Sequence, residues 1–135
     1  MQAKGTFSVK SFTPTEVTPD PAITTGAPVG ISLMEKLFEG EIVGRAATLF
    51  TAAFDQTTGV GTYLAMESFE GTLNGRSGAF NFAHSATTTG TDRSAAFFVI
   101  VPGTGTEELT GITGTGDINI DADGTHNIEF DYELG

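Results

Sequence analysis

An eight-residue turn motif occurs twice in the chain, and this repeat constrains the fold more than any other feature. Residues 38–45 read FEGEIVGR, and residues 69–76 read FEGTLNGR. In each copy two glycines four positions apart allow the backbone to fold back around one aliphatic residue. The motif therefore predicts two β-hairpin turns, with Ile42 and Leu73 pointing into the interior that the turns enclose.

Each copy of the motif also carries a glutamate and an arginine at mirrored positions. If the aliphatic residue marks the tip of the turn, Glu39 faces Arg45, and Glu70 faces Arg76 in the second copy. Opposite charges placed directly across two strands stabilise their pairing by about 0.2–1 kcal/mol. We therefore expect the glutamate and arginine within each copy to pair, which gives both arginines a structural role.

The rest of the sequence fits a single all-β domain. The 135 residues, 39% of them hydrophobic, are enough for one compact domain over 1–135 and leave no room for a second. Eighteen glycines and eleven phenylalanines favour short strands and tight turns over helices. Alternating or continuous apolar positions predict eight strands, at about 4–10, 29–38, 45–54, 60–69, 78–84, 94–101, 116–121 and 125–134.

Two segments depart from the regular alternation of apolar and polar residues. Residues 13–28 carry four of the five prolines and predict a long loop or arm. A stretch rich in threonine and glycine at 87–91 leads into the sixth strand, which is apolar at every position over 95–101. Such a strand is typically buried on both faces, so we expect it at the centre of the sheet or covered by a partner chain.

Eight strands that follow one another along the chain favour an antiparallel sheet in meander order. Eight antiparallel strands commonly close into a barrel, because closure removes the exposed edges that would otherwise recruit other chains. We therefore predict a closed or nearly closed barrel. A two-sheet sandwich is the main alternative.

Charge and composition exclude several classes of function. The net charge of −11 disfavours binding to nucleic acids and to anionic membranes, and favours neutral or cationic ligands. The absence of cysteine excludes disulfides, zinc–thiolate sites and thiol catalysis. Residues 1–7 lack the apolar core of a signal peptide, and no apolar run is long enough to span a membrane. We predict a cytoplasmic protein, and from the sixth strand and the proline-rich arm a homo-oligomer.

Two glycine-rich stretches and the second turn motif carry a family resemblance. Residues 101–106 (VPGTGT) and 108–116 (ELTGITGTG) resemble the crossing before a late strand in allene-oxide-cyclase-like and dirigent-like barrels. Together with 67–80 (ESFEGTLNGRSGAF) and His84-Ser85, the sequence is similar to a bacterial family of small proteins, domain of unknown function 3224. The resemblance implies a calycin-type barrel that is often oligomeric and has no assigned activity. The functional residues of allene oxide cyclase do not map onto this chain, so isomerase activity is not implied.

The candidate site residues are polar side chains in phase with apolar strand positions. His84 follows Phe80 and Phe82 at every second position, and His126 precedes Ile128 in the same way, so both imidazoles should face the interior. Glu67 alternates with Tyr63 and Phe69, although apolar residues also occupy the opposite face of this strand. We take Glu67, His84 and His126 as candidates for acid–base catalysis. The predicted ligand-binding residues are Tyr63, Glu67, Phe80, Phe82, His84, His126, Phe130 and Tyr132.

Other motifs fail on inspection, and we predict neither a metal nor a cofactor. The two histidines and Glu67 match the residue types of a two-histidine, one-carboxylate metal site, but they come from three strands without ligand spacing. Residues 103–108 lack the third glycine of a dinucleotide fingerprint. Residues 119–124 begin like a calcium loop, but the position of its closing glutamate is Phe130. Arg93 has no assigned partner and belongs either to the surface or to the rim of a pocket.

Three hypotheses for function follow. The first is a small barrel that holds a small organic or apolar ligand, with aromatic walls and Glu67, His84 and His126 as polar anchors. The second is an enzyme of isomerase, cyclase or hydrolase type that uses the same three residues for proton transfer. The third is a structural protein whose barrel serves as a scaffold for self-assembly. Fold alone does not choose among them.

Overall fold

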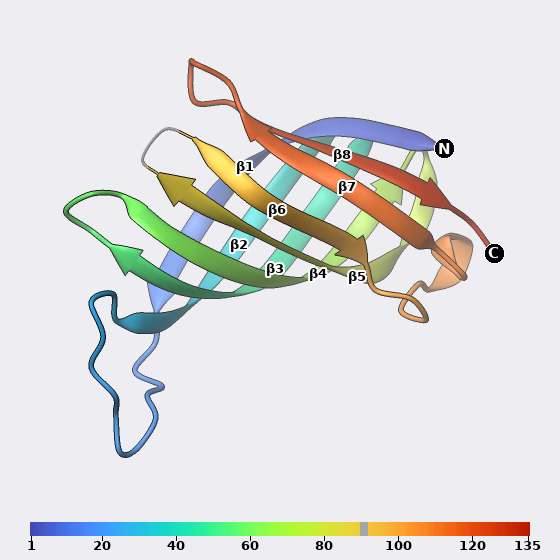
Figure 1. Cartoon of the computed structure of the whole chain (residues 1–135). Helices are drawn as coiled ribbons and strands as arrows, with labels where there is room; N and C mark the ends of the chain where they lie inside the picture. The colour runs from blue at the N-terminus through green and yellow to red at the C-terminus, as the bar shows by residue number, and fades with distance from the viewer. Residues whose placement is uncertain (90–91) are drawn as a thin grey trace.

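A computed structural model describes residues 1–89 and 92–135 and contains, within these ranges, one antiparallel sheet of eight strands and one short 3₁₀ helix (Figure 1). The elements are β1 (Gln2–Pro14), β2 (Val29–Gly40), β3 (Ile42–Asp55), β4 (Val60–Leu73), β5 (Arg76–Thr89), β6 (Arg93–Ile100), η1 (Glu107–Leu109), β7 (Thr113–Ile120) and β8 (His126–Glu133). Neighbouring strands pair in sequence order, and β1 also pairs with β8, so the sheet closes on itself. The prediction of eight antiparallel strands in meander order is confirmed, and the two-sheet sandwich does not form. Part of the predicted segment 87–91 lies outside the described residues.

The pairing is uneven around this closed sheet. The junctions β2–β3, β3–β4 and β4–β5 each align ten or more residue pairs. In contrast, the described parts of β6 and β7 pair at a single position, Ile100 with Gly114. We call this junction the seam, and it is the weakest line of backbone hydrogen bonding in the sheet.

The two turn motifs lie side by side, where β3 begins and β4 ends. Gly44 pairs with Gly71, and Ile42 pairs with Leu73. Both glycines have positive φ values, 147° and 154°. A Cβ atom on Gly44 would lie 2.2 Å from the carbonyl oxygen of Glu70, so the close approach of the two strands requires glycine. Ile42 and Leu73 are fully buried, as predicted.

The predicted ion pairs within each motif are wrong. Arg45 Nε lies 2.7 Å from Glu70 Oε1, so the pair joins one copy of the motif to the other. The reason is the register, which places Arg45 directly opposite Glu70 on the adjacent strand. The predicted partners Glu39 and Arg76 form no ion pair within the described residues. Because both members of the observed pair are more than half exposed, it adds at most about 1 kcal/mol.

Aromatic side chains fill one end of the interior, which we call the closed end. Phe80 and Phe130 meet edge to face with ring centroids 5.4 Å apart, and Phe82 meets Phe130 in the same way at 5.2 Å. The segment 101–112, which includes η1, crosses over this end and inserts Leu109 and Ile112, both with no exposed area. The fully buried side chains at this end therefore form a continuous apolar core.

The proline-rich segment extends from the opposite end, which we call the open end (Figure 1). β1 continues to Pro14, so the loop begins two residues later than predicted. Residues 15–28 contain no strand or helix and connect β1 to β2, and Thr15 N donates to Ile31 O at 2.9 Å where the loop leaves the sheet. The predicted loop is therefore present, and its role as an arm stays a prediction.

The prediction that the sixth strand is buried on both faces within the chain is wrong. Phe98 and Ile100 of β6 turn inward, whereas Phe97 is 55% exposed on the outside. The sheet is a single closed layer, so within the described residues no second layer of structure covers the outer face of this strand. The alternative, that a partner chain covers this strand, is taken up below.

Candidate functional site

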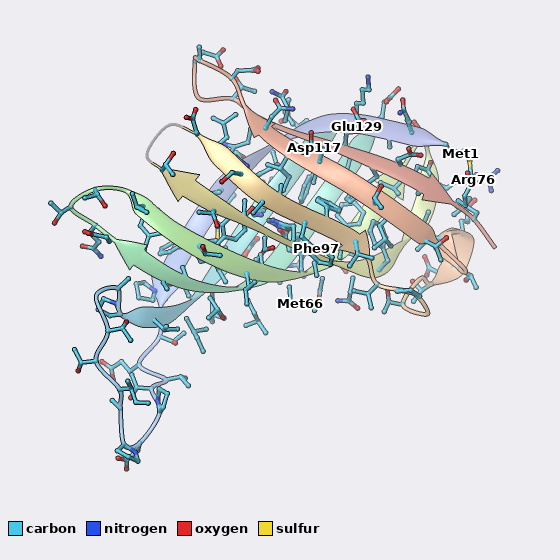
Figure 2. All side chains as sticks on the ribbon, in the orientation of Figure 1. Met1, Met66, Arg76, Phe97, Asp117 and Glu129 are labelled. Atoms are coloured by element: carbon cyan, nitrogen blue, oxygen red, sulfur yellow. The ribbon has the colours of Figure 1, made fainter. Side chains whose placement is uncertain are left out.

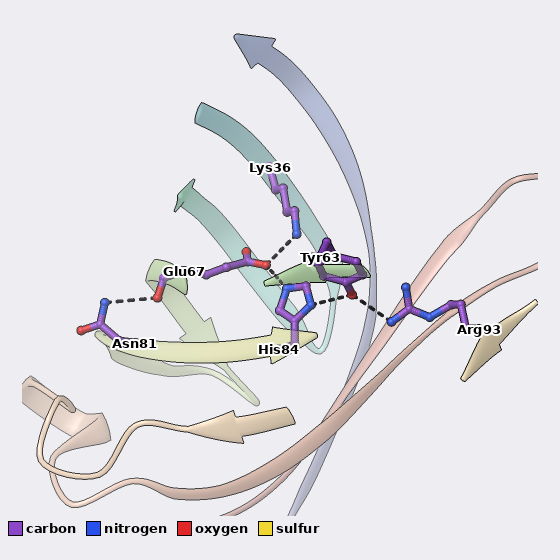
Figure 3. Close-up of polar contacts among 6 residues, drawn as sticks. All are labelled: Lys36, Tyr63, Glu67, Asn81, His84 and Arg93. Carbon is purple, nitrogen blue, oxygen red and sulfur yellow. Dashed lines mark hydrogen bonds and ion pairs between the residues drawn. The ribbon is translucent and has the colours of Figure 1, made fainter. Parts of the chain in front are cut away.

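Three ionisable side chains meet in the interior of the closed sheet. Glu67 on β4 has no exposed area, and its Oε2 atom accepts hydrogen bonds from Lys36 on β2 and His84 on β5 (Figure 3). Lys36 Nζ lies 2.6 Å from this oxygen, and His84 Nε2 is the second donor. Strand alternation places all three side chains inward, in phase with buried apolar neighbours on the same strands.

Tyr63 and Arg93 extend this cluster toward the open end. The Tyr63 hydroxyl lies 2.9 Å from His84 Nδ1 and accepts a hydrogen bond from Arg93 Nη2, also at 2.9 Å. The result is one connected series, Lys36–Glu67–His84–Tyr63–Arg93, which we call the polar chain. Its members come from β2, β4, β5 and β6, so only the closed sheet brings them together.

The protonation states of the polar chain follow from its contacts. Burial alone would raise the pKa of Glu67, but the hydrogen bond from His84 and the charge on Lys36 outweigh it and hold that pKa below its ordinary value. Burial lowers the pKa of His84, although the contact with Glu67 opposes the shift. We therefore assign a charged Glu67 and a neutral His84 with its proton on Nε2. Nδ1 then accepts a hydrogen bond from the Tyr63 hydroxyl.

Two buried oxygens beside the polar chain have no hydrogen-bond partner in the described part of the chain. They are Glu67 Oε1 and Thr48 Oγ1. Thr48 on β3 pairs directly with Glu67 across the sheet, so both atoms belong to the same layer of the interior. An unpaired buried polar atom lowers the free energy of unfolding by about 1–3 kcal/mol. This layer of the interior therefore contributes less to stability than the aromatic core.

A pocket opens beside the polar chain at the open end. It has a volume of about 770 Å³, and its wall is mainly apolar, with Phe12 on β1, Phe50 and Phe54 on β3, and Pro28 from the proline-rich segment. Phe50 also stacks on Tyr63, with ring centroids 5.1 Å apart and planes 16° apart. The stacked rings of Phe50 and Tyr63 thus lie between this pocket and Arg93.

Arg93 also borders the seam. A second cavity, of about 400 Å³, is lined by Arg93 on β6 and by residues 117–120 of β7. Asp92 and Asp117 line the same cavity, but neither forms an ion pair with Arg93. Among the described residues Arg93 has no acidic partner, and its contacts are the hydroxyl and the ring of Tyr63.

Of the three predicted catalytic residues, the structure brings Glu67 and His84 together and leaves His126 apart. His126 begins β8 at the open end, where its ring lies 5.0 Å from that of Phe7. It is half-buried and lines a cavity of about 530 Å³ formed by β1, β2 and the turn before β8. Burial lowers the pKa of His126, and the charges of Lys36 and Arg93 add to the shift.

Most of the predicted ligand-binding aromatics belong to the packed core. Phe80, Phe82 and Phe130 contact one another at the closed end, and Tyr132 accepts a hydrogen bond from Asn74 Nδ2 at 2.9 Å there. Each is at most 2% exposed. Tyr63 is the predicted aromatic that lies next to a pocket. The role of the other four in ligand binding stays a prediction.

Sequence analysis missed Lys36 and left Arg93 unassigned. The signal for Lys36 was its position two residues before Phe38 on the same strand. Side chains at this spacing point to the same face, so an inward Phe38 implies an inward Lys36. Arg93 gave no comparable signal, because its contact with Tyr63 depends on the pairing of β5 with β6. Within the described residues, no three histidine, cysteine or acidic side chains lie close enough to hold a metal ion. The described helical segments also include none with the length and apolar character needed to cross a bilayer.

Comparisons with known proteins agree with this architecture. Among solved structures, a protein of unknown function from the DUF3224 family of Shewanella oneidensis MR-1 is 31% identical, with a TM-score of 0.84. The match covers 100% of this chain and 98% of that protein. None of the curated proteins matches the sequence. The model of a family described as "Protein of unknown function (DUF3224)" matches residues 3–132, and this chain therefore belongs to that family.

Proposed function

We propose that the protein binds a small organic molecule with an apolar body and an acidic head group at the open end of the closed sheet. The observation that carries the proposal is Arg93, a cation without an acidic partner in the described chain, separated from an apolar pocket by the stacked rings of Phe50 and Tyr63. This refines the first hypothesis from the sequence. The binding site moves from the aromatic core to the open end.

The pocket supports the apolar part of the ligand. Its volume of about 770 Å³ lies within the roughly 300–1,000 Å³ typical of small-molecule sites. Phe12, Phe50 and Phe54 supply aromatic walls, and Asp55 is the one charged residue that lines it. A hydrocarbon or aromatic body would gain about 25 cal/mol for each Å² of apolar surface that it buries there.

The interior charges support the acidic part. Lys36 is neutralised by Glu67, whereas the hydrogen bond that the Arg93 side chain donates within the described residues goes to the uncharged Tyr63. A guanidinium group binds a carboxylate through two parallel hydrogen bonds, so an acidic head group would supply the missing counter-charge. The net charge of −11 favours neutral or cationic ligands at long range. At this position the local cation favours an anion.

Three eight-carbon probes that differ only in their head group test the proposal: octanoic acid, 1-octanol and octylamine. We expect octanoic acid to raise the melting temperature most, because a ligand at one hundred times its dissociation constant adds about 2.7 kcal/mol of stability. In Arg93→Gln the advantage of the acid over the alcohol should disappear. Arg45→Gln, which removes a surface arginine paired with Glu70, is the matched control and should keep it.

The outcomes separate the two parts of the proposal. If none of the probes changes the melting temperature, and calorimetric titration also detects no binding, the proposed binding function is wrong. If the acid and the alcohol bind equally well to the unaltered protein, the pocket binds ligands but the assignment of the head group to Arg93 is wrong.

A second candidate function is acid–base catalysis, and one specific contact favours it. Glu67, His84 and Tyr63 form a series of carboxylate, imidazole and hydroxyl, in which His84 is placed to take the Tyr63 proton. Glu67 would stabilise the resulting imidazolium, and Arg93 would stabilise the phenolate. The class of reaction would be proton transfer, as in an isomerase, a cyclase or a hydrolase.

The catalytic candidate has its own test, which uses a ligand identified by the thermal assay. An enzyme of this type would exchange an acidic C–H hydrogen of that ligand with deuterium from the solvent. Tyr63→Phe should abolish the exchange and leave the affinity within about tenfold. Equal exchange rates with and without the protein would refute catalysis of this kind.

We further propose that the closed sheet is of the calycin or allene-oxide-cyclase type that the sequence resemblance implies. Eight antiparallel strands in meander order support this assignment. A superposition on an allene oxide cyclase that failed to align the eight strands in the same order would contradict it.

A further inference from the structure

The outer surface of β3 to β6 is free of charge over a wide area, which we call the neutral face. It consists of the outward residues of 47–53 on β3, 62–68 on β4, 81–87 on β5 and 94–99 on β6, together with Leu33 on β2. Strand pairing aligns five of them in one row across the strands: Leu33, Leu49, Met66, Ala83 and Val99. A second row contains Thr51, Leu64, Ser85 and Phe97.

The large apolar side chains of the neutral face are strongly exposed. Leu64 is 60% exposed, Leu49 57% and Phe97 55%, and Met66 between them is 49% exposed. Single exposed apolar side chains are ordinary on protein surfaces, but a contiguous patch of them marks an interaction site. The register makes this patch contiguous, because Leu49 pairs with Met66, and Leu64 and Phe97 both pair with Ser85.

Charge is distributed in the opposite way on the other side of the molecule. Asp117 on β7 and Glu129, Asp131 and Glu133 on β8 point outward. Figure 2 shows Asp117 and Glu129 at the upper side of the closed sheet and Met66 and Phe97 toward the lower side. Two copies of a chain with a net charge of −11 repel each other. The neutral face is therefore where a second copy can approach with the least repulsion.

We infer that the neutral face binds the neutral face of a second copy of this chain in an isologous dimer. The face spans four strands about 4.8 Å apart and seven residues at about 3.3 Å each, or about 440 Å², and Leu33 adds one further side chain on β2. Two such faces would bury about 900 Å², the size expected of a weak, reversible association. A twofold axis that lies in the plane of the interface and runs along the strands would bring each row against its own copy.

The contact also accounts for the unusual composition of β6. The sequence of 95–101 is apolar at every position, as in a strand covered on both faces, yet Phe97 is exposed in the single chain. A second copy placed on the neutral face would cover that side chain. This inference is independent of the proposed ligand, because the face lies on the outside of the sheet and the pocket at its open end.

Sedimentation equilibrium of the full chain tests the inference. From about 1 to 100 μM we expect the unaltered protein to reach twice the chain mass of 14.0 kDa. Leu64→Glu places a charge at the centre of the face and should raise the dissociation constant at least about 100-fold. Ile120→Glu is the matched control, because Ile120 is also strongly exposed, at 51%, but lies on β7 in phase with the inward-facing Ile118 and outside the neutral face, and it should leave the dimer intact.

Salt provides a second readout. Because the face contains no ion pairs and the two copies repel each other, raising sodium chloride from about 50 to 500 mM should strengthen the dimer or leave it unchanged. A strictly monomeric protein at 100 μM would overturn the inference. So would a folded Leu64→Glu variant that associates as strongly as the Ile120→Glu control, or a dimer that salt dissociates.

Discussion

The two ends of the interior are built by the same strands but stabilised in different ways. On three strands, two successive inward positions hold a phenylalanine at the closed end and an ionisable residue next to it. These neighbours are Phe38 and Lys36 on β2, Phe69 and Glu67 on β4, and Phe82 and His84 on β5. At the closed end each buried ring contributes about 1.5–3 kcal/mol. At the open end the buried ion pair contributes little net stability, because removing two charges from water offsets their attraction. The closed end therefore carries the stability of the fold, and the open end is where function is expected.

The largest effect should come from removing Glu67. In Glu67→Ala the ammonium group of Lys36 remains buried without a counter-charge and His84 loses its acceptor, so we expect a loss of about 3–5 kcal/mol in the free energy of unfolding. Urea unfolding followed by circular dichroism measures this loss. A change below about 1 kcal/mol would show that water already reaches the site.

A double variant distinguishes the two ends. Lys36→Met combined with Glu67→Leu removes both charges, and we expect it to recover most of the stability lost in Glu67→Ala. At the closed end, Phe80→Ala should also cost about 3–5 kcal/mol, but adding Phe130→Ala should increase the loss. If the charge-free double variant is as unstable as Glu67→Ala, the two ends are stabilised in the same way.

A smaller effect should appear on acidification. Burial holds the pKa of His84 below its ordinary value. As the pH falls, His84 is therefore protonated at a higher pH in the unfolded chain than in the folded protein. Stability from this group is present above about pH 6.5 and is lost as the pH drops toward the folded pKa. Each unit of pKa difference corresponds to about 1.4 kcal/mol. The pKa of Glu67 is also lowered, so a further loss begins below about pH 4.5.

Unfolding free energies measured between pH 7.5 and pH 5 in steps of about half a unit check this dependence. His84→Gln should flatten the curve over that range, because the amide does not titrate. A curve of equal slope in the variant would assign the dependence to other groups, and His126 is the first candidate because burial lowers its pKa too.

The smallest effect should come from Thr48→Val. Its hydroxyl is buried without a hydrogen-bond partner among residues 1–89 and 92–135, so a methyl group in its place should raise the free energy of unfolding by up to about 1 kcal/mol. Thr62→Val is the control, because that hydroxyl lies on the outer face and shares a hydrogen bond of 2.8 Å with Thr87. A loss of stability in Thr48→Val would indicate that a hydrogen-bond partner reaches the hydroxyl in solution.

Sequence analysis captured what depends on local pattern. The turn motifs, the burial of Ile42 and Leu73, the eight strands and the inward direction of Glu67 and His84 all follow from spacing along one strand or across one turn. The pairing of Arg45 with Glu70 could not be predicted in this way, because it depends on the register between β3 and β4.

The polar chain shows the same limit. Lys36, Glu67 and His84 lie on three different strands, and their meeting depends on the curvature of the closed sheet as well as on alternation. The long-range pairing of β5 with β6 brings Arg93 to Tyr63. For the sixth strand, composition was informative but ambiguous, since apolar residues on both faces fit either a central strand or a surface that associates.

The described parts of β6 and β7 share a single residue pair, so resistance to opening is uneven around the sheet. Thermal breathing concentrates where the fewest hydrogen bonds must break, and the other junctions of β2 to β5 resist it with ten or more aligned pairs each. Arg93 borders this joint. A fluctuation that loosens this wall would widen the cavity that Arg93 lines, and it would give the ligand proposed above a lateral route to the guanidinium group while the rest of the fold stays intact.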